Sequence, residues 1–336
     1  MNRAEIAALV AELNEPRFRA DQVWRWVAGG AGSFDEMTNL SKSLREKLAA
    51  CCKLSPPEVL MKQVSSDGTM KLLWGFSDGA TVESVVMRYR HGNTVCISTQ
   101  VGCRMGCAFC ASTRGGRVRD LTPGEMLDQV QYSARECGER ISNIVLMGIG
   151  EPLDNFDNVI RFLELVGSEE GAGIGMRHIS LSTCGPAGGI EKLAELDLQL
   201  TLSVSLHAPD DETRSKLMPI NRVSGGVEEL IRRCKAYREK TGRRISYEYL
   251  LAEGQTDSDE QAERLAELLK GTDSHVNLIP LNHVDGSMLE PSSPERIEHF
   301  RTLLEKRGVN ATVRRRMGAD IDAACGQLRR RRDNIE

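Results

Sequence analysis

The feature that most constrains the fold is a regular alternation between short β-rich runs and amphipathic helical stretches over residues 94–314. The β-rich runs, each followed by a stretch of helical periodicity, are TVCISTQ, SNIVLMG, RHISLST, LTLSVSLH, RRISYEYLL and HVNLIPL. Six strand-helix units predict a parallel sheet with right-handed crossovers, and six is fewer than the eight of a closed barrel. We therefore predict an α/β fold built on an open, partial barrel, with its functional site at the carboxyl ends of the strands.

The rest of the chain divides into three smaller parts. Residues 1–55 carry apolar stripes at helical spacing behind cap-type residues, and they predict a small N-terminal helical domain. Residues 56–93 hold two β-rich runs on either side of the turn sequence SDG, which predicts an antiparallel lead-in to the barrel. Residues 315–336 form a C-terminal segment with a basic tail.

Composition and charge indicate where the protein works and how it could bind RNA. Hydrophobic residues make up 40% and charged residues 27%, no apolar run approaches the length of a membrane span, and no signal peptide is visible at the N-terminus. We expect a cytoplasmic protein with no membrane partner. The formal net charge of −4 gives no general attraction to nucleic acid, so RNA binding would need local patches.

Two arginine clusters could supply such patches, although a solvated charged surface explains them equally well from charge alone. The arginines are Arg114, Arg117 and Arg119 in the first cluster, and Arg314, Arg315, Arg316, Arg329, Arg330, Arg331 and Arg332 in the second.

The cysteines point to metal chemistry. Cys103, Cys107 and Cys110 have the spacing C-x3-C-x2-C and directly follow the first barrel strand. A cuboidal iron–sulfur cluster usually takes four thiolates, so three leave one iron open to bind S-adenosylmethionine and pass it an electron. Structural zinc would need four ligands, typically in paired C-x2-C units, and the sequence has no second pair. We predict a [4Fe–4S] cluster. Five other cysteines lie singly or as a pair among apolar neighbours, and we expect them to be buried structural thiols: Cys51, Cys52, Cys137, Cys184 and Cys234.

The cysteine motif, with Phe109 before its last cysteine, resembles the radical S-adenosylmethionine superfamily, whose fold is a partial (βα)6 barrel. The chain is further similar, nearly end to end, to the RlmN/Cfr family of RNA adenosine methyltransferases, and more to its RlmN branch. The segments that carry this likeness are FRADQVWRW, CISTQVGCRMGCAFCAST, NIVLMGIGEPLDN, ISLSTCG, SLHAPDDETRSKLMPIN, VNLIPLN and GADIDAACGQL.

The resemblance implies a set of site residues. Those expected to contact S-adenosylmethionine are Gly150, Glu151, Ser182, Ser205, Leu206, His207 and Asn282. The family uses two S-adenosylmethionine molecules per turnover, one to methylate a cysteine, here Cys325, and one to supply the radical that takes a hydrogen from this methyl group. The carbon then bonds to adenine, and a second cysteine, here Cys96, releases the product by forming a disulfide. Glu83 matches the proposed proton acceptor, with Cys96 as the alternative base.

The resemblance also implies substrates and partners. These are carbon 2 of an adenosine in large-subunit (23S) ribosomal RNA, the adenosine next to the transfer RNA anticodon, and an external one-electron reductant such as flavodoxin or ferredoxin. The helical domain and the arginine clusters would hold the RNA backbone. Asp120 stands where the family more often has asparagine, in a segment that we expect to face RNA.

Three alternatives stay open from the sequence. The first is Cfr-type methylation at adenine carbon 8, which uses the same two cysteines. The second is a noncatalytic RNA-binding protein that keeps the cluster as a structural clamp, and the third is a radical reaction on a small molecule. Cys96 and Cys325 favour a methyltransferase, because a binding protein needs neither thiol.

Overall fold

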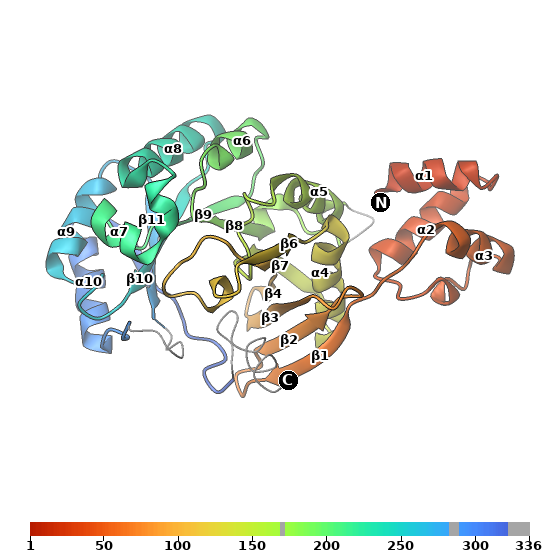
Figure 1. Cartoon of the computed structure of the whole chain (residues 1–336), viewed down its shortest axis with the longest axis horizontal. Helices are drawn as coiled ribbons and strands as arrows, with labels where there is room; N and C mark the ends of the chain where they lie inside the picture. The colour runs from red at the N-terminus through yellow and green to blue at the C-terminus, as the bar shows by residue number, and fades with distance from the viewer. Residues whose placement is uncertain (169–171, 282–288, 322–336) are drawn as a thin grey trace.

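A single ten-stranded mixed sheet organises the computed structural model, which describes residues 1–168, 172–281 and 289–321 (Figure 1). Its strand order is β1-β2-β3-β4-β7-β8-β9-β10-β11-β12. The strands are β1 (Glu58–Val64), β2 (Met70–Gly75), β3 (Thr81–Tyr89), β4 (Gly92–Cys96), β7 (Ile141–Leu146), β8 (Ile179–Thr183), β9 (Thr201–Ser205), β10 (Ile245–Leu251), β11 (Ser274–Pro280) and β12 (Asn310–Val313).

The strands from β4 to β12 pair in parallel, with helices on the outer side of the curved sheet (Figure 1). The helices are α4 (Pro123–Cys137), α5 (Phe156–Gly167), α6 (Gly189–Glu195), α7 (Asp211–Leu217), α8 (Gly226–Thr241), α9 (Asp259–Leu268) and α10 (Pro294–Lys306). Local sequence fixes their ends: α4, for example, starts at a capping box between Thr122 and Glu125 and stops at Gly138 in a left-handed conformation. The predicted α/β partial barrel is confirmed.

Two features of the sheet differ from a simple six-stranded barrel. The antiparallel strands β1, β2 and β3 continue the barrel sheet, because β3 pairs with β4 along a register that places Val85 opposite Cys96. A seventh parallel strand, β12, closes the other edge. Its sequence NATV is too short and too exposed to show strand alternation, which is why the sequence pattern did not predict it.

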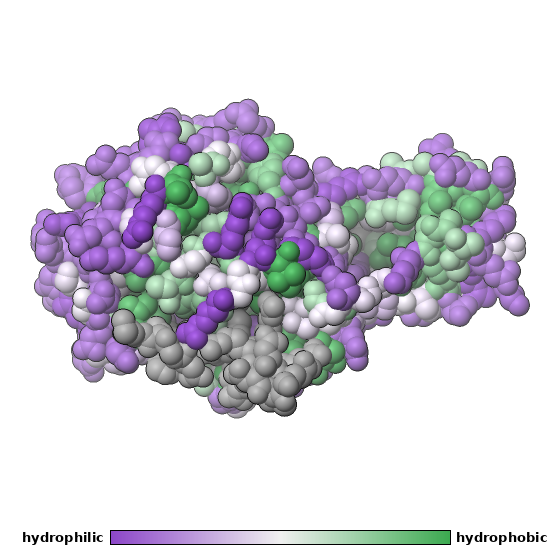
Figure 2. Space-filling model, in the orientation of Figure 1, coloured by the Kyte–Doolittle hydropathy of each residue, from purple (hydrophilic) through white to green (hydrophobic). Residues whose placement is uncertain are grey.

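The N-terminal helices form a separate lobe beside α4 (Figure 1). They are α1 (Arg3–Glu12), α2 (Phe18–Ala28) and α3 (Lys42–Cys51), and they enclose a small core with fully buried Trp24 and Met37. The lobe contacts the barrel where the Gln131 side chain donates a hydrogen bond to the carbonyl of Val27, at 3.4 Å. Hydrophilic residues cover much of the barrel face in Figure 2, whereas the lobe shows a hydrophobic patch there. None of the described helices is both long and apolar enough to cross a membrane.

Candidate functional site

A cavity of about 470 Å³ opens at the carboxyl ends of the parallel strands. The predicted site residues that line it are Glu83, Cys96, Cys103, Cys107, Cys110, Gly150, Glu151, Ser182, Ser205 and His207. Leu206 is fully buried and does not line the cavity. Asn282 and Cys325 lie outside the described residues, as do Arg329, Arg330, Arg331 and Arg332. A smaller cavity of about 220 Å³ lies at the opposite ends of β10 and β11. It is lined by Cys234 but by none of the predicted site residues.

The cysteine loop is shaped by a small hairpin formed by β5 (Gln100–Gly102) and β6 (Arg117–Asp120). Gly102 has a φ of +75°, and a Cβ atom there would lie 1.9 Å from the carbonyl oxygen of Gly116. The amide of Cys103 donates to that same oxygen at 3.0 Å. Only glycine allows the hairpin backbone to approach this closely, and the approach sends the chain into the cysteine loop.

The three loop cysteines fit an iron–sulfur cluster better than a single metal ion. Burial, together with the nearby Cys110, raises the pKa of Cys103 to about 11, and burial and both neighbouring cysteines also raise the pKa of Cys107. Bound iron cations would supply the positive charge that such thiolates need. Within residues 1–168, 172–281 and 289–321, no three His, Cys, Asp or Glu side chains are placed to hold one metal ion. In a cuboidal cluster each thiolate binds a different iron, so the thiolates need not converge on one point.

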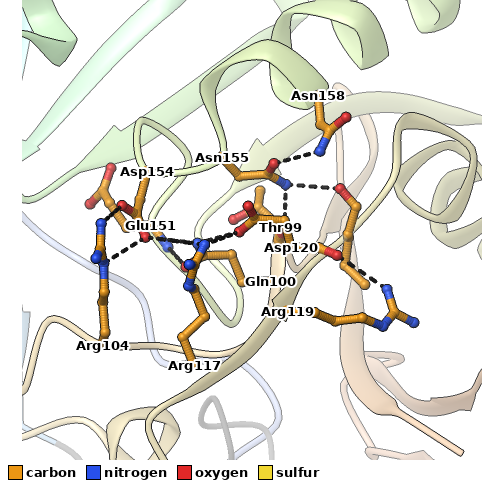
Figure 3. A network of polar contacts seen from close by, with 11 residues as sticks. Thr99, Gln100, Arg104, Arg117, Arg119, Asp120, Glu151, Asp154, Asn155 and Asn158 are labelled. Atoms are coloured by element: carbon orange, nitrogen blue, oxygen red, sulfur yellow. Dashed lines mark hydrogen bonds and ion pairs between the residues drawn. The ribbon is translucent and has the colours of Figure 1, made fainter. Parts of the chain in front are cut away.

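A polar network fastens the turn after β7 to the cysteine hairpin (Figure 3). The Gln100 amide nitrogen donates to Asp120 at 2.8 Å and to Asp154 at 3.0 Å, and its amide oxygen accepts from the Glu151 backbone at 2.9 Å. Gly150 has a φ of +111°, and a Cβ atom there would lie 2.7 Å from the backbone nitrogen of Gln100. The network therefore sets the distance between the cysteine loop and the turn that carries Gly150 and Glu151.

The Asp120 side chain is 32% exposed and takes part in this network, whereas Val118 on the same strand is 67% exposed, so it stays a prediction that the segment faces RNA. The Asp120 carboxylate accepts hydrogen bonds from Gln100 and from Arg117, the latter at 2.8 Å. The neighbouring Arg119 is held between Asp78, at 2.7 Å, and Glu125, at 2.7 Å. Two arginines of the first cluster thus form ion pairs within the protein, and the exchange of asparagine for aspartate affects this inner network.

The Glu151 carboxylate joins the ends of β7 and β8. One of its oxygens, Oε1, accepts hydrogen bonds from the Leu153 amide at 3.0 Å and from the Thr183 hydroxyl at 2.7 Å. The other, Oε2, accepts from the Cys184 amide at 2.8 Å. Burial raises the pKa of Glu151, and these hydrogen bonds oppose that rise. Because a carboxylate oxygen can accept two hydrogen bonds, Oε2 can also accept one from a ligand ammonium group.

His207 lies just beyond β9, in a left-handed conformation with a φ of 59°. Burial lowers the pKa of its imidazole to about 3, and its Nδ1 accepts a hydrogen bond from the Leu250 amide at 3.0 Å. The ring packs edge-on against Phe109 of the cysteine loop, with centroids 4.8 Å apart. His207 is therefore a neutral group that links β9, β10 and the cluster loop.

Arg214 of α7, which the sequence did not reveal as a site residue, binds the backbone at the ends of β8 and β9. Its fully buried guanidinium donates to the carbonyls of Cys184, Ser205 and Leu206, each at 3.0 Å. A charged residue in the polar sequence DDETRSK looks like a surface residue, so nothing in the local pattern marks it as buried. The structure also places Cys184 in the cavity wall.

The cysteines expected to be structural differ in burial. Cys184 and Cys234 are buried as expected, but Cys51 is exposed, and Cys52 and Cys137 are only partly buried, so the expectation is wrong for these three. They lie at helix ends, where an apolar neighbourhood in sequence does not ensure burial.

Glu83 and Cys96 face the cavity from the antiparallel side of the sheet. Glu83, Val85 and Met87 alternate along β3 and all line the cavity, and Cys96 lies opposite Val85 on β4. Glu83 is only 3% exposed and pairs with the buried Lys71, 2.9 Å away. Burial raises the pKa of Cys96, whereas the charges of Arg314 and Lys71 act to lower it.

The segment after β12 crosses the cavity mouth and returns to the turn between β1 and β2. Arg314, Arg315 and Arg316 line the cavity. Farther along, the Gly318 amide donates to Asp67 at 2.9 Å, and Asp320 accepts hydrogen bonds from the Ser66 amide, at 2.9 Å, and from the Ser65 hydroxyl. We call these contacts the C-terminal latch, and they hold the segment that leads toward Cys325.

Comparisons with known proteins match both parts of the chain. The radical SAM superfamily model matches residues 97–268, and a model of the ribosomal RNA large subunit methyltransferase N-terminal domain matches residues 1–54. The superfamily implies a [4Fe–4S] cluster and S-adenosylmethionine as cofactors.

Full-length relatives agree with these models. A protein of Desulforamulus reducens named probable dual-specificity RNA methyltransferase RlmN is 56% identical, over 98% of this chain and 95% of its own length. One of Clostridium tetani with the same name is 54% identical over 95% and 92%. The crystal structure of a radical SAM methyltransferase from Sphaerobacter thermophilus matches with a TM-score of 0.93 and 44% identity, over 97% of each chain. The chain therefore belongs to the RlmN family of radical S-adenosylmethionine, dual-specificity RNA methyltransferases.

Proposed function

We propose that this enzyme methylates carbon 2 of an adenosine in 23S ribosomal RNA and of the adenosine next to the transfer RNA anticodon, and that it does so in the cytoplasm. The observation that carries the proposal is the meeting of Cys96 and Glu83 with the three cluster cysteines around one cavity. A noncatalytic RNA-binding protein would have no use for a thiol and a carboxylate in that position.

Cys103, Cys107 and Cys110 would hold the cluster, which would take an electron from a flavodoxin- or ferredoxin-like donor and supply it for the cleavage of S-adenosylmethionine. The residues that bind and orient this molecule are Gly150, Glu151, Ser182, Ser205 and Asn282. His207 lines its pocket, whereas the neighbouring Leu206 is fully buried and does not reach the cavity. Two molecules are used in each turnover, because Cys325 must first acquire a methyl group. Transfer through a methylated cysteine, the cysteine relay, is needed because an aromatic carbon is too weak a nucleophile to take a methyl group directly.

Cys325 then delivers its carbon to the adenine and stays bonded to the RNA until the adduct is resolved. Glu83 accepts the proton released from the ring. The Cys96 sulfur then attacks the Cys325 sulfur, so that the disulfide forms as the bond between the Cys325 sulfur and the transferred carbon breaks. This carbon takes up a proton to become the methyl group. Cys96 must remain a thiol until that moment, and the raised pKa that burial gives it is consistent with this order. The arginines of residues 314–316 line the cavity mouth and would neutralise RNA phosphates.

The experiment uses two cysteine variants. We expect Cys96→Ala to accumulate a covalent protein–RNA adduct and Cys325→Ala to form none, as seen in denaturing gels and by mass spectrometry. Nucleoside analysis of RNA from a deletion strain should show loss of 2-methyladenosine. Loss of 8-methyladenosine instead would establish the Cfr-type reaction, and an absence of adduct with Cys96→Ala would contradict the cysteine relay.

A further inference from the structure

Lys71 is a buried charge to which the proposed reaction assigns no task. It lies on β2 with 0% of its side chain exposed, and its Nζ is 2.9 Å from Oε2 of Glu83, which is 3% exposed. Among the ion pairs joining residues in the described ranges, this is the one in which both side chains are almost completely buried. A lysine is rarely buried so fully unless a partner or a function holds it there.

The strand register places the Lys71–Glu83 ion pair on the same face of the sheet as the Cys96 thiol. Lys71 lies opposite Val85 on β3, and Val85 lies opposite Cys96 on β4. Glu83 is two residues before Val85, on the same face of β3. Lys71, Glu83 and Cys96 therefore surround Val85 on the face that lines the cavity.

Stability alone does not account for this arrangement. Removing both charges from water costs several kcal/mol for each ion, and well-packed apolar residues often do as well or better at such positions. A buried carboxyl without a nearby cation tends to hold its proton, whereas a cation at hydrogen-bond distance favours the ionised form. Only the ionised carboxylate can accept the proton that the adenine ring releases.

We propose that Lys71 is a positioning residue for the methyl transfer reaction, holding the Glu83 carboxylate ionised and directed toward the Cys96 side of the cavity. The inference rests on the proposed function, in which Glu83 is the proton acceptor. It assigns the base and the resolving thiol to different groups: Lys71 keeps Glu83 charged, whereas burial, the largest effect on the pKa of Cys96, keeps that thiol protonated.

The other charges near the cavity wall come from several elements. Lys71 on β2 contacts Glu83, and Arg314 after β12 acts on Cys96 of β4. Glu248 on β10 is a second carboxyl that lines the cavity. Burial raises the pKa of Glu248, and Arg314 and a 2.8 Å hydrogen bond from Asn277 oppose that rise. Arg314 acts on both Cys96 and Glu248, and Lys71 contacts Glu83 directly, at 2.9 Å.

The test is the resolution of the protein–RNA adduct in a single turnover by the cluster-loaded enzyme. We expect Lys71→Met to form the adduct and to methylate Cys325 at the wild-type rate, but to resolve the adduct roughly tenfold more slowly at neutral pH. Its pH profile for resolution should move upward by about 1–3 units, because a buried carboxyl that has lost a cation at hydrogen-bond distance holds its proton to higher pH. Lys71→Arg, which keeps the charge, should restore most of the rate.

Lys62→Met is a matched control, since Lys62 on the neighbouring β1 makes a 2.9 Å ion pair with Glu136 whose side chains are 38% and 33% exposed. This variant should leave the pH profile unchanged. If Lys71→Met resolves the adduct with the wild-type profile, or if Lys71→Arg is as slow as Lys71→Met, the positioning role is wrong.

Infrared spectroscopy separates this inference from the proposed function. Lys71→Met should show the carbonyl band of a protonated carboxyl near neutral pH, and Lys71→Met/Glu83→Gln should lack it. An adduct missing from both Cys96→Ala and Lys71→Met would contradict the cysteine relay, while the infrared band would still decide the effect of Lys71 on Glu83.

Should Lys71→Met fold poorly, Lys71→Gln provides the same comparison. An infrared spectrum of Lys71→Gln that is the same as that of the wild type would overturn the proposal.

Discussion

Single residues determine whether the cluster loop can form, and Gly102 is the clearest case. A Cβ atom at this position would overlap the carbonyl oxygen of Gly116, at 1.9 Å, and the φ of +75° is unfavourable for other residues. We expect Gly102→Ala to open the hairpin and to reduce bound iron and sulfide severalfold after reconstitution. Gly115→Ala is the control, because nothing lies within 4 Å of its Cβ position, and equal iron content in both variants would contradict this explanation.

His207 should make stability depend on pH. Its pKa is about 3 in the folded chain and 6.5 as the ordinary value, so the unfolded state binds a proton first as the pH falls. The stabilisation from the neutral ring is complete above about pH 6.5 and is lost as the pH falls toward 3, by at most about 1.4 kcal/mol per pH unit. Urea unfolding of His207→Gln between pH 7 and 4 should show a shallower loss than wild type, and parallel curves would rule out this role.

At the scale of elements, the C-terminal latch joins the last described segment to the first hairpin of the sheet. Asp320→Ala removes the acceptor for Ser65 and Ser66 and should free the segment from the β1–β2 turn. Trypsin should then cleave after Arg314, Arg315 and Arg316 severalfold faster.

In the same variant, methylation of Cys325 should slow while S-adenosylmethionine cleavage stays near normal, because the cluster residues lie on other elements. Asp273→Ala, which loses only a 3.5 Å ion pair with Arg238, is the control. Unchanged proteolysis of Asp320→Ala would show that the latch does not hold the segment.

The sequence predicted the elements well where a strong pattern existed, and poorly where contacts between distant segments decide the structure. The six strand-helix units and the cysteine loop followed from periodicity and spacing. Arg214 and Lys71 did not, because a buried charge is recognised only from the partners that surround it. The hydrogen bond between Asp120 and Gln100 was missed for the same reason, since Gln100 lies 20 residues away on the other strand of the hairpin.

At the scale of the whole molecule, the net charge of −4 requires RNA binding to use particular surfaces. The N-terminal lobe offers Phe18, which is 56% exposed and has the Arg19 guanidinium 4.9 Å from its ring centre. An exposed aromatic ring beside an arginine can stack on an unpaired base. Phe18→Ala should weaken RNA binding by about 1–3 kcal/mol without changing the salt dependence, because no charge is lost.

Filter binding at several salt concentrations would measure this effect. Leu196→Ala, at an apolar side chain on the barrel that is 42% exposed, should leave the affinity unchanged. Equal affinities of Phe18→Ala and wild type would exclude base stacking on the lobe.

The latch also has a consequence for the order in which the enzyme is made. Ser65 and Asp320 are 255 residues apart, so the turn between β1 and β2 leaves the ribosome long before the segment that it will hold. A growing chain can present its three cluster cysteines while Cys325, the proposed methyl carrier, is still untranslated. Under the proposed function, translation that stops before Cys325 would therefore leave the cluster residues without the cysteine that hands the carbon to RNA.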